Sequence, residues 1–302
     1  MSKQGNQTSD YIIDLLIRAL FASLLALPYR WRVPAMGWIM ARIVSPLAGF
    51  KKRIRDNLQY VCPEISDAEI KKLYYQVPNN AGRTLIEIYS GDTFIEHVKN
   101  TPIKGPGAKA LRDAHASGAP VVIVTGHFGN YDVVRTAMVA LGYKVGAIYM
   151  PMKNVFYNKH YEAAISHIAT PLFSRDRKGL AQMVRFLRDG GMTFFGVDQY
   201  MSHGAELEFF GKPALTALSS AKMALKTGAV VVPVYGIRAE NGLDFSILAD
   251  EPIAHTDAET MTQEINDSLE KQVRMHMGQW FWIHRRWKPD RQRMRAAAKT
   301  AP

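Results

Sequence analysis

From residue 108 onward, short apolar runs of strand length alternate with segments whose apolar residues recur at helical spacing. The β-branched run at 121–125 predicts a buried strand, and the pattern from Val133 to Leu141 predicts a helix. The further predicted strands are "KVGAIYM", "TPLFS", "MTFFGVDQ", "AVVVPVYGIR" and "LDFSILAD", and the further predicted helices are "GAKALRDAHASG", "NKHYEAAISHIA", "RKGLAQMVRFLRDGG", "LSSAKMALKTG" and "ETMTQEINDSLEKQVRMHM". Strands separated by helices favour crossover connections, so the expected fold class is α/β, with a mostly parallel mixed sheet flanked by helices.

The residues before this alternation are predicted to be helical. Within 35–100, Ser66 stands three residues before Glu69, which is the spacing of a capping box at the start of a helix. Pro78 predicts a kink or break in that helix. We therefore expect residues 35–302 to form a single α/β domain with a helical N-terminal part.

The N-terminal apolar run at 11–27, "YIIDLLIRALFASLLAL", predicts a membrane-associating helix. Its two charged residues, Asp14 and Arg18, are four apart and can pair on one helix face. The run precedes "PYRWR", a composition typical of the bilayer interface, and the first ten residues lack the positive charge of a signal peptide. At about 17 residues it is short for a span, so residues 1–34 are expected to be an interfacial helix or a tilted anchor, with a packed soluble helix as the alternative.

Composition and charge narrow the class of partner. Hydrophobic residues make up 47% of the 302, enough for a sizeable core, and the one cysteine, Cys62, excludes an internal disulfide framework. The net charge of +11 gathers in "KKRIR" (51–55) and "HRRWKPDRQRMR" (284–295). Such clusters indicate anionic lipid headgroups, an acidic carrier protein or nucleic acid as the partner, or else a solvated basic surface.

Tryptophans interleave with the C-terminal basic residues. The residues concerned are Trp280, Trp282, Trp287, Arg285, Arg286 and Lys288. This mixture suits the membrane interface or an acidic carrier protein, and we prefer that interpretation to single-stranded nucleic acid or to simple core packing of the tryptophans. Several signatures are absent from the sequence, namely the Gly-x-Ser-x-Gly elbow, the His-Glu-x-x-His helix and the Walker A loop.

Candidate chemistry lies in "HFGNYD", where the predicted strand at 121–125 hands over to the next helix. In open α/β sheets this edge is the usual ligand-binding side. Gly129 permits a turn and Asn130 is a good N-cap, so we expect Asp132 to approach His127. The carboxylate would then fix the imidazole tautomer and make His127 a general base. No metal site is expected, because further ligands are missing nearby. A purely structural role for His127 remains the alternative.

The sequence resembles a known family. "HFGNYD" fits the His-x4-Asp (HX4D) signature of the glycerolipid and lysophospholipid acyltransferase superfamily, and further blocks are similar to its lipid A biosynthesis branch, the lauroyl and myristoyl transferases. Those blocks are "RIRDNLQYVCPEISDAE" (53–69), "LFSRDRKGLAQMVRFL" (172–187), "GVDQ" (196–199), "FFGKPALTALSSAKMALKTGAVVVPVYGIR" (209–238) and "GQWFWIHRRWKP" (278–289). They cover nearly the whole chain in order, and Gln-x-x-x-x-His-Arg-Arg is the most telling.

The resemblance implies an O-acyltransferase at the cytoplasmic face of the cell inner membrane. It would move a fatty acyl chain from acyl carrier protein, or from acyl-CoA, to a membrane lipid acceptor, without cofactor, metal or nucleic acid. His127 would be the base and Asp132 its partner, and the substrate-binding positions would be Gly129, Asn130, Arg175 and Asp198. Arg175 matches a family arginine thought to hold an anionic group. A surface role for Arg175 and a strand-end cap for Asp198 remain open.

One departure from the pattern concerns the acceptor. The lipid A branch usually carries Glu at the last motif position, where this chain has Asp132. Either carboxylate can orient a histidine, but a lysophospholipid or lyso-aminolipid becomes an alternative acceptor to a lipid A precursor. A hydrolase that uses water as acceptor and a non-catalytic lipid-binding protein are the other hypotheses.

Overall fold

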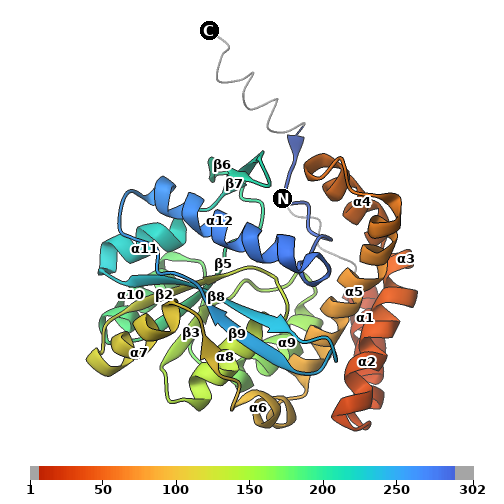
Figure 1. Ribbon diagram of the computed structural model, residues 1–302. Helices are drawn as coiled ribbons and strands as arrows, with labels where there is room; N and C mark the ends of the chain where they lie inside the picture. The colour runs from red at the N-terminus through yellow and green to blue at the C-terminus, as the bar shows by residue number, and fades with distance from the viewer. Residues whose placement is uncertain (1–6, 290–302) are drawn as a thin grey trace.

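The computed structural model describes residues 7–289 and is built around a seven-stranded sheet (Figure 1). The strand order is β1 (Ile103–Lys104), β9 (Phe245–Ala249), β8 (Val230–Arg238), β2 (Val121–Thr125), β5 (Met192–Gly196), β3 (Val145–Ile148) and β4 (Leu172–Phe173). From β8 to β4 all neighbours are parallel, whereas β9 is antiparallel to β8 and β1 is parallel to β9. The expected mostly parallel mixed sheet is confirmed.

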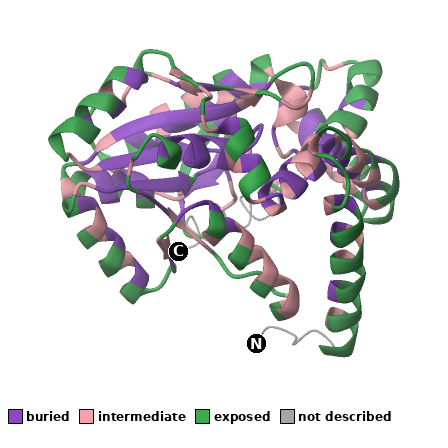
Figure 2. Ribbon diagram, turned by 90° about the horizontal axis from the view of Figure 1, so that it is seen from below, coloured by how far each residue is buried: buried purple, intermediate pink, exposed green. Residues whose placement is uncertain are grey.

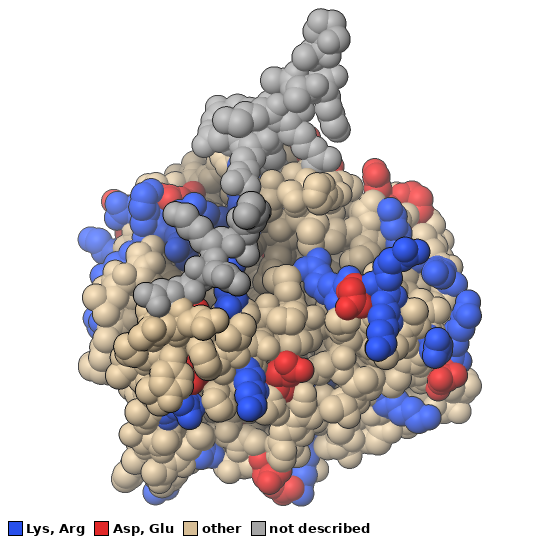
Figure 3. Space-filling view, turned by 180° about the vertical axis from the view of Figure 1, so that it is seen from behind, with Lys and Arg blue, Asp and Glu red and all other residues tan. Residues whose placement is uncertain are grey.

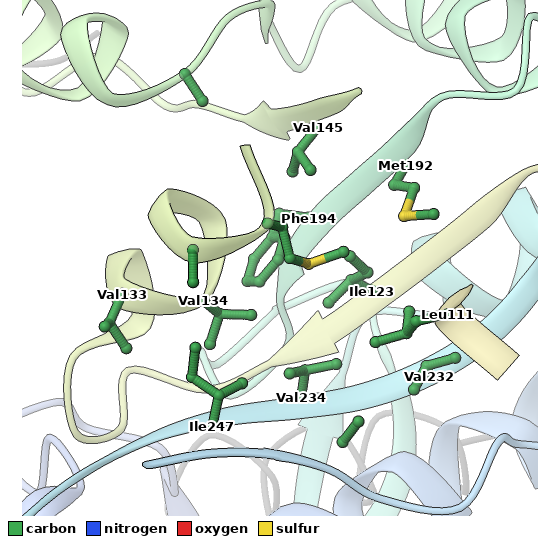
Figure 4. Close-up of a cluster of buried hydrophobic side chains, with 14 of the residues drawn as sticks. Leu111, Ile123, Val133, Val134, Val145, Met192, Phe194, Val232, Val234 and Ile247 are labelled. Carbon is green, nitrogen blue, oxygen red and sulfur yellow. The ribbon is translucent and has the colours of Figure 1, made fainter. Parts of the chain in front are cut away.

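Helices cover both faces of the sheet, because alternate strand residues point to opposite sides. Ile123 packs on one face with α7 (Gly107–Ser117), α8 (Tyr131–Ala140) and α9 (Val155–Ile168). Val122 packs on the other face, and that layer is formed by α10 (Arg177–Arg188), α11 (Ser219–Thr227) and α12 (Ala258–Met275). Figure 4 shows Val133 and Val134 of α8 beside Val234, Ile247 and Phe194 in the first layer. Each fully buried side chain of this kind contributes roughly 1.5–3 kcal/mol.

The N-terminal helices stack at one side of the sheet (Figure 1). They are α1 (Gln7–Leu25), α2 (Tyr29–Ile39), a π-helical turn (Met40–Val44), α3 (Ser45–Leu47), α4 (Phe50–Val61), α5 (Asp67–Tyr89) and α6 (Asp92–Val98). Phe21 of α1, Val33 of α2 and Ile86 of α5 share one buried cluster. The predicted ion pair also forms, with Arg18 Nε 3.0 Å from the buried Asp14 carboxylate.

Most of α1 is nevertheless exposed, and Figure 2 shows it extending away from the buried sheet. No single helix within residues 7–289 is long and apolar enough to cross a bilayer. By length and composition alone, the pair Tyr29–Leu47 and Phe50–Val61, bent by 86° at the break between them, would pass as a broken span. The membrane role of the N-terminal region stays a prediction.

Three local features, at Ser66, at Pro78 and at residues 205–216, differ in how well the sequence predicted them. The capping box is confirmed, with Glu69 N donating to Ser66 Oγ and Ser66 N donating to Glu69 Oε2. A kink or break was predicted at Pro78, and the break is wrong, because α5 continues past this buried proline to Tyr89. The hairpin of β6 (Ala205–Phe209) and β7 (Lys212–Thr216) was not predicted. Its turn places Phe210 and Gly211 at positive φ, and a phenylalanine there is not a recognised turn signal.

Candidate active site

His127 and Asp198 are brought together by the register of two neighbouring parallel strands. Thr125, at the end of β2, is the partner of Gly196, at the end of β5. His127 and Asp198 each lie two residues beyond these positions, at the same edge of the sheet. His127 Nδ1 is 2.8 Å from Asp198 Oδ1, so strand register determines which carboxylate reaches the imidazole.

The Asp198 carboxylate is buried, and both of its oxygens accept hydrogen bonds. Its second oxygen, Oδ2, accepts a hydrogen bond from the backbone N–H of His127 at 2.8 Å and another from Trp280 Nε1 at 2.9 Å. An ionised carboxylate can only accept, so Nδ1 of His127 carries the proton that is donated to Oδ1. The other ring nitrogen, Nε2, is therefore left as the basic atom of the neutral imidazole, with Gln199 Nε2 at 3.4 Å.

The prediction that Asp132 orients His127 is corrected by this geometry. Asp132 lies in the first turn of α8, and its Oδ1 is 2.9 Å from Nε of Arg135, one turn along the same helix. Both side chains are buried, and Arg135 Nη2 also donates to the Ile165 carbonyl at 2.8 Å. Burial raises the pKa of the Asp132 carboxyl, and the nearby guanidinium partly offsets that rise. Asp132 thus belongs to an internal ion pair next to the base.

The Asp198 carboxylate makes the His127 imidazole more basic. Burial by itself lowers the pKa of His127, but attraction and hydrogen bonding to Asp198 outweigh it, so the pKa is raised above 6.5. Burial likewise raises the pKa of Asp198, but attraction and hydrogen bonding to His127 outweigh it, so that pKa is lowered. An imidazole of this kind takes up a proton readily at neutral pH, as a general base requires.

Gly129 and Asn130 shape the loop and do not contact the cavity described below. Gly129 has a φ of +53°, and a Cβ on it would lie 1.8 Å from the Gly236 carbonyl oxygen. The Asn130 side chain is fully buried, and its Oδ1 accepts hydrogen bonds from the backbone N–H groups of Asp132 and Val133. The N-cap prediction is confirmed, whereas the substrate-binding role expected for these two residues is not supported.

A buried polar network behind the loop was missed by sequence reasoning. Asn130 Nδ2 donates to Glu87 Oε2 at 2.8 Å, and Arg238 Nη2 donates to the same oxygen at 2.7 Å. Thr84 Oγ1 donates to the Gly129 carbonyl at 2.9 Å. These partners come from α5 and β8, so the loop that carries His127 is fixed from two sides by groups far away in sequence.

A cavity of about 510 Å³ opens beside His127. His127, Asp132, Arg135 and Gln199 line its polar part. Its apolar and aromatic lining includes Tyr131, Ile148, Tyr149, Met150, Met152, Tyr161, Ile165, Leu172 and Phe194. Arg175 also lines it, as an exposed residue with Nη1 3.5 Å from Met150 Sδ. Size and lining suit a ligand with a long apolar part and a polar reacting group.

The C-terminal tryptophans are buried and do not form an exposed binding surface. Trp280, Trp282 and Trp287 are 0–5% exposed and pack with Phe209 and Phe210. The prediction that these tryptophans face the membrane or a carrier protein is wrong, because the segment folds inward and places Trp280 on Asp198. Core packing, the less favoured interpretation, is what the structure has.

Among residues 7–289, no group of three or more His, Cys, Asp or Glu side chains is arranged to hold a metal ion. The geometry by itself supports acid–base chemistry at His127.

Comparison with known proteins gives the site its context. A sequence model of the family described as bacterial lipid A biosynthesis acyltransferase matches residues 2–289. The phosphatidylinositol mannoside acyltransferase of Mycobacterium tuberculosis (strain CDC 1551 / Oshkosh) is 23% identical over 195 residues, which is 63% of this chain and 62% of that protein. The lipid A biosynthesis lauroyltransferase of Escherichia coli (strain K12) is 23% identical over 245 residues, or 78% of each chain.

Among solved structures, the 1-acyl-sn-glycerophosphate acyltransferase PlsC from Thermotoga maritima aligns with 90% of this chain and 99% of that chain. The sequence identity is 14% and the TM-score is 0.35, which is too low to establish a shared fold. For the two sequence relatives, the matched part of this chain covers less than two thirds of the length of the mycobacterial protein and more than three quarters of the lauroyltransferase.

Proposed function

We propose a function from one premise, that the chain belongs to the bacterial lipid A biosynthesis acyltransferase family, whose match covers residues 2–289. The protein transfers a fatty acyl chain from a thioester donor, acyl carrier protein or acyl-CoA, to a hydroxyl group of an acceptor lipid. The single observation that carries this proposal is the His127–Asp198 pair at 2.8 Å beside a largely apolar cavity. Arg175 lines that cavity, and its proposed role is to attract an anionic part of a substrate.

The proposed reaction is a direct transfer with His127 as general base. Nε2 of His127 takes the proton from the acceptor hydroxyl, and the oxygen attacks the carbonyl carbon of the thioester. The carbon–sulfur bond then breaks, and the leaving thiolate takes the same proton from the imidazolium. An ester and a free thiol result. Asp198 stabilises the imidazolium between the two proton transfers. The same stabilisation is what raises the pKa of His127.

The proposed location is the cytoplasmic face of the cell inner membrane. Exposed apolar side chains on α1 support the membrane contact in this proposal, since Ile12, Ile13 and Leu16 are 49–66% exposed. The start of α9, next to the cavity-lining Met152, lies against the same helix. Asn154 Nδ2 donates to the Asp10 carbonyl at 2.9 Å, and the Tyr11 and Phe156 rings are 5.3 Å apart. An apolar surface of this kind next to the cavity would let a lipid reach His127 without crossing water.

The acceptor that we propose is a lipid A precursor or a lyso-lipid. The family match and the lauroyltransferase favour the former. The mycobacterial relative is named for an acyltransferase on a different lipid, which keeps the lyso-lipid alternative. Mass spectrometry of lipids from cells that lack the protein would decide, because either an under-acylated lipid A or a lyso-lipid should accumulate.

The decisive test of the mechanism is His127→Ala in purified protein. We expect acyl transfer to fall by about a thousandfold or more, because no other base replaces the imidazole. The melting temperature should fall only modestly, because the buried Asp198 carboxylate loses the imidazole but keeps its hydrogen bonds from the residue 127 backbone N–H and from Trp280, and melting curves verify that the variant is folded. His203→Ala, at an exposed histidine, is the matched control and should retain activity.

Product analysis in the same assay separates the remaining alternatives. A hydrolase would release free fatty acid at full rate without acceptor lipid, and a lipid-binding protein without turnover would form no ester in the wild type. Undiminished transfer by His127→Ala would refute the assigned base.

A further inference from the structure

A second cavity, of about 960 Å³, lies between α4 and the C-terminal segment. Its aromatic lining includes Phe50, Tyr60 and Trp287. Its cationic residues are Arg53 on α4 and Arg285 and Lys288 on the C-terminal segment. The basic cluster at 51–55 and the described part of the C-terminal one, residues 284–289, therefore meet around one hollow although they are more than 200 residues apart in the chain, and a solvated surface does not require that.

Several polar groups of this cavity already have partners, but two of its guanidinium groups have no acidic partner among residues 7–289. The acidic residue at its edge, Asp56, is paired with Lys52 at 2.9 Å. Asn57 Nδ2 donates to the carbonyls of Trp282 and His284. Within residues 7–289, no carboxylate forms an ion pair with Arg53 or Arg285. Figure 3 shows the molecule from behind, with Lys and Arg side chains in several groups and acidic side chains among them.

Arg285 and Arg286 are neighbours in the C-terminal segment, residues 276–289, but they have different surroundings. Arg286 is buried, with Nη1 on the Leu215 carbonyl at 2.8 Å and Nη2 on Thr216 Oγ1 at 2.6 Å. Arg286 therefore fixes the segment to β7, and Arg285 is exposed at the cavity. Lys288 Nζ lies 3.8 Å from the centre of the Tyr200 ring, which keeps its charge close to the same hollow.

One lining residue connects the second cavity to the loop that carries the base. Phe281 lines it, its backbone N–H donates to the His127 carbonyl at 3.0 Å, and the two rings are 6.4 Å apart. His284 also lines it, and its Nε2 accepts a hydrogen bond from the N–H of Tyr200. That bond and burial, which lowers the His284 pKa to about 4, keep this ring neutral. His284 therefore adds no positive charge to the cavity, whereas Arg53 and Arg285 do.

We propose that this second cavity binds a phosphate group of a substrate while the reacting group lies at His127. The inference rests on the proposed acyl transfer and names a recognition site for it. Guanidinium groups match phosphate oxygens in geometry as well as charge, and the aromatic walls suit the carbon part of the ligand. Two sources share this chemistry: the phosphates of the acyl donor's pantetheine carrier, and a phosphate on the headgroup of the acceptor lipid.

Equilibrium binding to the purified full chain in neutral detergent tests the site without relying on turnover. One arm compares coenzyme A with phosphate-free pantetheine, and the other compares lysophosphatidic acid with monoacylglycerol. Calorimetry is run on the wild type, Arg53→Gln, Arg285→Gln and the control Arg188→Gln, whose exposed arginine lies on α10 away from the cavity. Melting curves verify that each variant is folded.

We expect the wild type to prefer the phosphate-bearing member of at least one pair by about tenfold or more, with the preference weakening as salt is added. Each cavity variant should lower that affinity about tenfold, and Arg188→Gln should leave it unchanged. A preference in the first arm assigns the phosphate to the donor, and one in the second arm assigns it to the acceptor.

Two results would overturn the site: equal binding of both members in both arms, or wild-type affinity in both cavity variants. Neither depends on whether the protein transfers an acyl chain. A wild type that binds as expected but forms no ester would instead refute the proposed function.

Discussion

Two carboxylates lie close to His127, and they differ in how the chain brings them there. Asp132 is five residues away in sequence, in the first turn of α8, and its side chain turns to Arg135 on the same helix. Asp198 is 71 residues away and arrives through the pairing of β2 with β5. Asp132 therefore pairs with Arg135, its neighbour on the same helix, whereas the partner of His127 is determined by the register of two strands.

The largest effect that separates the two carboxylates should come from Asp198→Asn. The amide cannot stabilise the imidazolium and can donate to Nδ1, which favours the wrong tautomer. We expect kcat to fall by about a thousandfold, with a smaller change in KM, in a steady-state transfer assay. Retention of near wild-type kcat would mean that the partner of the base lies elsewhere, and a greater loss in Asp132→Asn would restore that residue to the role.

The next effect concerns stability, and it should belong to Asp132. Asp132→Asn leaves the buried Arg135 guanidinium without its counter-charge, so the free energy of unfolding should fall by about 3–5 kcal/mol. Urea denaturation measures this loss. The double variant Asp132→Asn, Arg135→Met should recover most of it, because both charges are then gone. No recovery would show that Asp132 contributes through some contact other than the ion pair.

The smallest effect is a displacement of the pH profile. Asp198 raises the pKa of His127 above 6.5, so kcat/KM of the wild type should fall on the acid side as the imidazole becomes protonated below that raised pKa. In Asp198→Asn the negative charge is lost, so the acid limb of the residual activity should move to lower pH. His284, with a pKa of about 4, does not titrate in this range. An unmoved limb would assign it to another group.

The sequence predicted the helices and strands of the α/β part well, because the spacing of apolar residues changes where a strand ends and a helix begins. The strand at 121–125, the helix after Asn130 and the capping box at Ser66 follow from local chemistry alone. The β6–β7 hairpin does not, since its turn carries a phenylalanine at positive φ. The break expected at Pro78 failed because a long buried helix can lose one hydrogen bond and continue.

The candidate site was predicted only in part. His127 could be located because a polar residue after a buried strand marks the ligand-binding edge. A signal for its partner was present, since "VVIVTGH" and "MTFFGVD" each place a titratable residue two positions beyond a buried strand. Choosing between Asp132 and Asp198 requires the order of the strands, which single-chain patterns do not give. The roles of Trp280 and Glu87 depend on contacts across more than 40 residues.

The pairing of Thr125 with Gly196 also limits how the gene can change length. Deleting or inserting one codon between the end of β2 and His127, or between the end of β5 and Asp198, would shift one of the two side chains relative to the strand ends and separate it from its partner. Among diverged relatives, length variation should therefore be purged from the two short stretches that follow the central strands.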